Sequence, residues 1–198
     1  VDGAPAITVE DAAVAPHWAD LGQRWLTLEQ YVKPYPICRW AHGPIDAAAT
    51  LRRDHGVTPD QIASVRIGTF EEASCLYRGA PTTSRQALYS LPFSVAAMLV
   101  KGGIGVGEIT GDGLRDPEVL RLLHATEIVV EDRHNARFPQ GRWGDVSVTL
   151  TDGRTLASGD INDHGGPDDP FTEAEFRAKF RAFTTPVLGE ARAGRMER

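Results

Sequence analysis

The segment Lys33–Asp46 (KPYPICRWAHGPID) restricts the fold of this chain more than any other part of it. Pro34 and Pro36 each fix their own φ, and each pushes the residue before it toward extended geometry. Regular helix is therefore excluded here, and we predict a stiff, extended stretch that presents Lys33 and Tyr35. A helix is predicted to follow, because a proline such as Pro44 suits the first helical position.

Proline, glycine and capping residues mark four predicted helices. The helix from Pro44 carries an apolar helical repeat and ends at His55-Gly56. Pro92 interrupts an apolar run from Ser84 to about Val100, so we predict a kink or break near Tyr89–Leu91. The other two helices begin at caps. They are Asp116 to about His124, and Thr172–Phe183, in which Glu175 closes a capping box and Phe176, Phe180 and Phe183 form the apolar face.

Alternating or β-branched apolar residues predict the strands. The predicted strands are Leu21–Tyr31, Ile62–Phe70, Ile128–Glu131, Asp145–Leu150 and Arg154–Ser158. Thr151-Asp152-Gly153 separates the last two and is typical of a hairpin turn, so that pair is expected to be antiparallel. We therefore predict an α+β fold, with a small antiparallel or mixed sheet and packed helices, rather than a doubly wound parallel sheet.

One domain is expected to account for residues 21–188 of the 198-residue chain. Residues 1–20 are weakly patterned and are interpreted as a connecting segment, and residues 189–198 as a charged, frayed tail. The first residues include no Met, no basic stretch and no apolar stretch, so no signal peptide is predicted. The chain is expected to begin partway along a longer product, or after processing.

The net charge of −6 and the absence of a basic block exclude nucleic acid as the main partner. No apolar run reaches the roughly 18 residues that a membrane span needs, so no membrane partner is predicted. Two cysteines, Cys38 and Cys75, make neither a disulfide framework nor a zinc site, and they fit a reducing cytoplasm at least as well as a secreted context, so a cytoplasmic location is expected. An anionic small substrate is still allowed, because a local group of cations can bind it.

The Lys33–Asp46 segment also contains the strongest candidate site. Its prolines hold the backbone, so its polar side chains are positioned at low entropic cost. The helix start at Gly43-Pro44 offers free N–H groups and a positive dipole end, which attract a carboxylate. Lys33 and Arg39 add cations, and His42 adds an imidazole suited to proton transfer. On spacing alone, the favoured alternative is an ordinary surface loop before a helix.

A second candidate site lies at the predicted helix break. Arg85, Tyr89 and Ser90 can face a substrate there, because a broken helix exposes N–H and C=O groups. The same helix carries an apolar stripe, so a core helix is the favoured alternative. Its members are Leu88, Leu91, Val95 and Leu99.

Two further motifs are rejected as ligand sites. The glycine run 102–113 matches a dinucleotide fingerprint poorly and follows a helix, so a connecting loop is predicted. Asp163 and His164 lack a second ligand cluster at metal spacing, so a turn is favoured and no metal is predicted. His134 and the other isolated histidines are expected to be structural or exposed.

Four motifs, in order, resemble the C-terminal domain of the MmgE/PrpD family. They are KPYPICRWAHGPIDAA, PTTSRQALYSLPFSVAAMLVKGGIG, VTLTDGRTL and GGPDDPFTEAEFRAKF, over about residues 20–188. The resemblance implies a small α+β domain that follows a larger helical N-terminal domain, with the active site between the two. It also implies that this chain is only the second of these domains.

The resemblance implies that several residues of this chain belong to that active site. It implies that Lys33 and His42 are catalytic, and that Cys38 stands where family members sometimes have His. Together with the charge and hydrogen-bonding arguments, it leads us to expect substrate binding by Tyr35, Cys38, Arg39, Arg85 and Ser90. Two positions depart from the family pattern, because Phe93 stands where a tyrosine is frequent and Leu88 where a basic residue is common.

The implied function is half of a cofactor-independent lyase or isomerase that acts on a di- or tricarboxylate. Proton abstraction next to a carboxylate would lead to dehydration, decarboxylation or epimerisation of a methylcitrate- or aconitate-like acid. The implied partners are a helical domain or subunit and further copies of the chain, and the isolated chain is expected to be inactive. Two alternatives stay open: a non-catalytic lid or interaction domain that needs a separate helical subunit, and a binding module that has lost catalysis.

Overall fold

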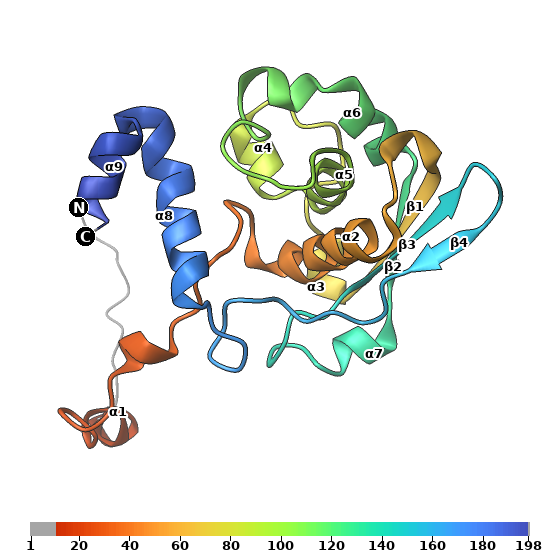
Figure 1. Ribbon diagram of the computed structural model, residues 1–198. Helices are drawn as coiled ribbons and strands as arrows, with labels where there is room; N and C mark the ends of the chain where they lie inside the picture. Colours follow the sequence, from red (N-terminus) through yellow and green to blue (C-terminus); the bar gives the residue numbers. More distant parts are fainter. Residues whose placement is uncertain (1–10, 198) are drawn as a thin grey trace, which may run out of the picture.

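A four-stranded mixed sheet, in the order β2-β1-β3-β4, organises the fold (Figure 1). The computed structural model describes residues 11–197. Strand β1 pairs in parallel with β2 and antiparallel with β3, which pairs antiparallel with β4. The strands are β1 (Ile62–Thr69), β2 (Thr126–Val130), β3 (Asp145–Leu150) and β4 (Thr155–Ala157). The predicted α+β fold and the predicted hairpin are confirmed.

Three helices build the core beside this sheet (Figure 1). They are α2 (His42–His55), α5 (Leu91–Lys101) and α6 (Pro117–His124). Helix α2 packs against β3 and α5, and α5 packs against α6. Buried apolar residues of α2, α5, α6, β1 and β3 form one core cluster, and their removal from water favours the folded state.

The local signals in the sequence account for most helix ends. Helix α2 ends at Gly56, whose φ of 60° lies in the left-handed region that favours glycine. The predicted break near Pro92 is confirmed, because α4 (Ser84–Leu88) ends there and α5 restarts at Leu91. The Ser90 hydroxyl caps α5 by accepting a hydrogen bond from the Phe93 N–H.

The remaining elements are short or lie near the chain ends. The helices are α1 (Asp11–Trp18), α3 (Glu71–Ser74), α7 (Asp132–Asn135), α8 (Glu173–Leu188) and α9 (Glu190–Met196). The 3₁₀ turns are η1 (Leu26–Glu29), η2 (Arg39–Ala41), η3 (Pro59–Gln61) and η4 (Gly111–Arg115). The predicted capping box of Thr172 and Glu175 begins α8, and the glycine run 102–113 is a loop that contains η4.

Two predictions at the ends of the chain are wrong. Residues 21–31 form no strand, because no sheet edge lies beside them to take their backbone hydrogen bonds, and a 3₁₀ turn forms instead. The tail is not frayed, because Ala193 of α9 is buried and Glu197 pairs with Arg177 and Arg181 of α8. Helix α8 also continues past Phe183 to Leu188. The predicted connecting segment lies partly outside the described residues.

The terminal elements expose many apolar side chains. Figure 1 shows α1, α8 and α9 to one side of the body that the sheet and α2 form. The large apolar residues that are at least 45% exposed in these segments are Trp18, Leu21, Trp25, Leu26, Leu28, Phe176, Phe183, Val187 and Met196. Exposed apolar residues of this size are uncommon on a protein surface that only contacts water. Within the described residues, no helix has both the length and the apolar character needed to cross a membrane.

The tight approach at Gly43 generates a stability prediction. A Cβ at Gly43 would overlap the backbone oxygen of Arg142 and lie 3.0 Å from that of Ile161. Since neither backbone oxygen can move freely, Gly43→Ala should lower the free energy of unfolding by about 2 kcal/mol. Gly103→Ala, whose Cβ would meet nothing within 4 Å, is the matched control. Urea denaturation measures both, and equal stabilities of the two variants would contradict the prediction.

Candidate functional site

The candidate site is built around a turn that closes on the carbonyl oxygen of Ile37. The Lys33 ammonium donates to this oxygen at 3.0 Å, and His42 Nε2 lies 3.2 Å from it. Because the two prolines prevent helix, the chain folds back over four residues before η2 and α2 begin. Lys33 and His42, which the sequence predicts as catalytic, therefore meet at one backbone oxygen.

His42 is fully buried and electrically neutral. Its Nδ1 lies 2.6 Å from the Tyr31 hydroxyl, and the Ile37 carbonyl can only accept, so Nε2 carries the proton and Nδ1 accepts from Tyr31. Burial lowers the pKa of His42 to about 4, against the effect of the Ile37 carbonyl, and the charges of Lys33, Arg39 and Lys179 add to the lowering. The imidazole thus holds the turn in place and does not face solvent.

Tyr31 links this turn to the next cation along the chain. The Arg39 guanidinium lies 3.7 Å over the Tyr31 ring, and its Nε donates to Asp163 at 2.5 Å. Burial, with a contribution from Asp163, raises the pKa of Tyr31 well above its usual range, so the hydroxyl stays protonated. Arg39 is therefore held in one orientation by an aromatic face and a buried carboxylate.

Tyr35 reaches a different carboxylate. Its hydroxyl donates to Asp46 at 2.7 Å, and the backbone N–H of His164 donates to the same carboxylate at 3.3 Å. Burial raises the pKa of Asp46 to about 6, although both hydrogen bonds oppose the shift. Asp46 thus fastens the start of α2 to the turn at residues 162–167.

A groove of about 770 Å³ opens beside this turn. Pro34–Pro36, the loop 104–108 and α8 line it, and Asp46 and His164 lie at its wall. The Lys179 ammonium of α8 donates to the Lys33 carbonyl at 2.5 Å.

Burial alone would lower the pKa of His164, but Asp169 and Glu175 outweigh it and raise that pKa. The rejected metal motif is therefore occupied by contacts within the protein.

The two predicted candidate segments meet through the backbone. The Cys38 N–H donates to the Leu88 carbonyl at 2.8 Å, which places Cys38 beside the helix break. Cys38 is partly exposed and Arg85 is exposed, whereas Ser90 is fully buried and its hydroxyl caps α5. Substrate binding by these three residues, like that by Tyr35 and Arg39, stays a prediction.

Four residues of the site are not predicted as functional from the sequence. Tyr31 lies in the segment 21–31, for which the sequence predicts a strand, and Asp163 lies in a turn for which the sequence predicts no ligand. Asp46 has the form of an ordinary first-turn acid, and Lys179 that of a solvated charge on a helix. The clustering of aromatic residues around KPYP is the only signal that points to Tyr31, and long-range contacts reveal the other three.

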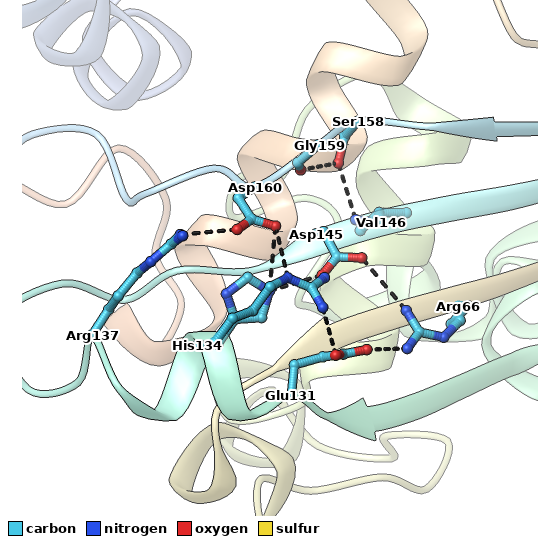
Figure 2. Close-up of polar contacts among 10 residues, drawn as sticks. Arg66, Glu131, His134, Arg137, Asp145, Val146, Ser158, Gly159 and Asp160 are labelled. Atoms are coloured by element: carbon cyan, nitrogen blue, oxygen red, sulfur yellow. Dashed lines mark hydrogen bonds and ion pairs between the residues drawn. The ribbon is translucent and has the colours of Figure 1, made fainter.

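A second polar cluster lies where β1 and β2 end and β3 begins (Figure 2). Single ligand atoms of His134, Asp145 and Asp160 lie within 4.8 Å of one another, as a metal site would require. The carboxylates of this cluster are already paired with guanidinium groups. Their ion pairs join Glu131, Asp145 and Asp160 to Arg66, Arg133 and Arg137. Because three positive charges balance three negative charges, the arrangement favours a structural network over a metal centre.

Comparison with known proteins agrees with this architecture. The family model of the MmgE/PrpD C-terminal domain matches residues 35–198. The cis-aconitate decarboxylase of Homo sapiens is 26% identical over 170 residues, which cover 83% of this chain and 35% of that protein. The mouse (Mus musculus) enzyme is 27% identical over 173 residues, with the same coverage. The cis-aconitate decarboxylase-like protein oryM of Aspergillus oryzae is 25% identical over 189 residues, 89% of this chain. The chain spans little more than a third of these relatives' length.

The buried imidazole generates a pH prediction. In the unfolded chain His42 has its ordinary pKa of 6.5, whereas in the folded chain its pKa is about 4. The unfolded state therefore binds more protons in this window, and stability falls as the pH falls through it. Between pH 6.5 and pH 4, the free energy of unfolding of the wild type should fall by up to about 3 kcal/mol more than that of His42→Gln. Urea denaturation at a series of pH values tests this, with His55→Gln as a control, and parallel wild-type and His42→Gln curves would contradict it.

Proposed function

The chain belongs to the MmgE/PrpD C-terminal domain family, and from this premise we propose that it forms the acid-binding wall of a lyase active site. The substrate class is a di- or tricarboxylate of the aconitate or methylcitrate kind, and the reaction is decarboxylation or dehydration. A helical domain or subunit forms the opposite wall. The names of the curated relatives support decarboxylation in particular.

The cation group beside the Ile37 turn carries this proposal. Lys33, Arg39 and Lys179 all act on His42 with positive charge, in a chain whose net charge is −6. Lys33 and Lys179 form no ion pair with any residue among 11–197, so their charges are available to a ligand. A polycarboxylate needs such cations twice, first for binding and then for the negative charge that develops during reaction.

The proposed reaction produces negative charge next to a carboxylate of the substrate. Loss of a proton or of carbon dioxide leaves an electron pair on the carbon next to a carboxylate, and that pair is delocalised as an enediolate-like charge. The exposed Lys33 ammonium is placed to stabilise this charge and to return a proton, since the Ile37 carbonyl fixes its position. His42 acts through the turn as a positioning residue, because it is sealed and neutral.

The apolar terminal segments support a missing wall. Trp18, Trp25 and Leu28 are 60%, 65% and 82% exposed, which is unusual for residues of this size. They lie just before the Lys33 turn, and Phe183 of α8 lines the groove beside it. A helical domain that covers these residues would also close the groove and exclude water from the acid. The isolated chain is therefore expected to be inactive.

The same exposed surface favours one alternative function. If the helical half is a separate subunit without catalytic groups, the chain is an interaction domain whose role is assembly. A complex that forms and covers Trp25, yet converts no polycarboxylate, would favour this alternative over the lyase.

The test of the lyase proposal uses the complete protein with its helical half. Lys33→Gln should lower kcat/KM for cis-aconitate or 2-methylcitrate by about a hundredfold, because it removes one well-placed cation from the transition state. Arg154→Gln, on the hairpin turn and paired with Asp152, is the control for loss of a positive charge. Steady-state kinetics on a panel of polycarboxylates measures both. Equal kcat/KM for Lys33→Gln and Arg154→Gln would remove Lys33 from the mechanism.

A further inference from the structure

Arg142 is a partly buried guanidinium without a counter-ion among residues 11–197. Its Nη1 donates to the Pro139 carbonyl at 2.8 Å, and its Nε is buried with no hydrogen-bond partner in the described chain. Burial lowers the pKa of Arg142, and the charge of nearby Arg39 lowers it further, while Asp163 opposes the shift. A guanidinium in this position is under-compensated, since a neutral carbonyl does not balance its charge.

Asp163 lies near both Arg39 and Arg142, but among residues 11–197 it forms an ion pair with Arg39 alone. Asp163 pairs with Arg39 through Nε alone, which leaves the two terminal nitrogens of Arg39 without a hydrogen-bond partner within residues 11–197. The balanced cluster of Figure 2 shows the contrast, because there each carboxylate has its guanidinium. Two guanidinium groups near one buried carboxylate leave a net charge of +1, which favours the binding of one further negative charge.

The backbone holds Arg142 firmly in this position. Its N–H donates to the Asn162 side chain at 2.9 Å, and Asn162 directly precedes Asp163. Its carbonyl lies against Gly43 at the start of α2, so close that a side chain there would overlap it. The same contacts that place Asp163 beside Arg39 therefore also place Arg142. A preorganised pair of this kind loses little entropy when it binds an anion.

We infer that Arg39 and Arg142 together form a subsite for one carboxylate group of an acid ligand, with Asp163 holding Arg39 in position. Guanidinium forks match the planar geometry of a carboxylate, which favours this anion over a spherical one. Contacts through Tyr31, His42 and the Ile37 carbonyl connect Arg39 to Lys33, so the subsite and the Lys33 turn hold each other in position. The identification of the ligand as the substrate rests on the proposed function.

The experiment measures binding of citrate, a tricarboxylate probe, to the complete protein by titration calorimetry. Arg142→Gln should weaken citrate binding by about tenfold or more, because a charged hydrogen-bonding partner is lost. Arg142→Lys keeps the charge without the fork and should give a smaller loss, which also covers the case in which Arg142→Gln fails to fold. Arg154→Gln is the control and should stay within about twofold of wild type.

The outcomes separate this inference from the lyase proposal. Citrate binding that depends on Arg142, in a protein that converts no polycarboxylate, would support the subsite and reject the lyase. Turnover with an unchanged KM in Arg142→Gln would reject the subsite and leave the lyase standing. Citrate binding by both Arg142 variants at wild-type affinity, or no citrate binding by wild type, would overturn the inference.

Discussion

The approach of α2 to the segment before β3 is the constraint on which the site depends. Gly43 lies so close to the backbone of Arg142 that only a residue without a side chain fits. This contact joins two parts of the chain that are about a hundred residues apart, and it sets the distances from Arg39 to Asp163 and from Asp46 to His164. The proline-bounded turn supplies the local stiffness, but the glycine contact determines which carboxylates the turn meets.

Charge balance separates the two polar clusters more clearly than residue type does. Both contain arginine, aspartate and histidine. In the cluster around His134, three guanidinium groups pair with three carboxylates, so the assembly is complete without a ligand. Around Tyr31 and His42, Arg39 pairs with Asp163, whereas Lys33, Lys179 and Arg142 form no ion pair among residues 11–197, although Glu108 and Glu175 also line the groove. Cations that lack a carboxylate partner inside an acidic protein point to an anionic ligand.

Local signals in the sequence predict most of the fold. Pro92, Asp116, Gly56 and Thr172 act within one turn of helix, so their effects do not depend on the rest of the chain. The segment 21–31 was mispredicted because alternation alone cannot say whether a neighbouring strand exists. The candidate site is predicted in part for the same reason. Lys33, His42 and Arg39 stand out in the sequence, but Asp163 and Arg142 acquire their roles through contacts that no local pattern contains.

The burial of His42 changes how the chemistry must be divided. A turn that gathers a lysine, an arginine and a histidine suggests a complete set for binding and proton transfer. In the structure the imidazole is buried and holds the Ile37 turn, so Lys33 is the exposed group of this turn, and Tyr35, Cys38 and Arg39 are partly exposed. Cations bind an acid and stabilise developing negative charge, but a protonated lysine or arginine cannot abstract a proton. Under the proposed function, the base is therefore either Asp46, which lies at the groove wall with a pKa raised to about 6, or a group of the helical domain. The expectation that the isolated chain is inactive therefore rests on the open groove, in which a bound acid stays exposed to water until a helical domain covers it.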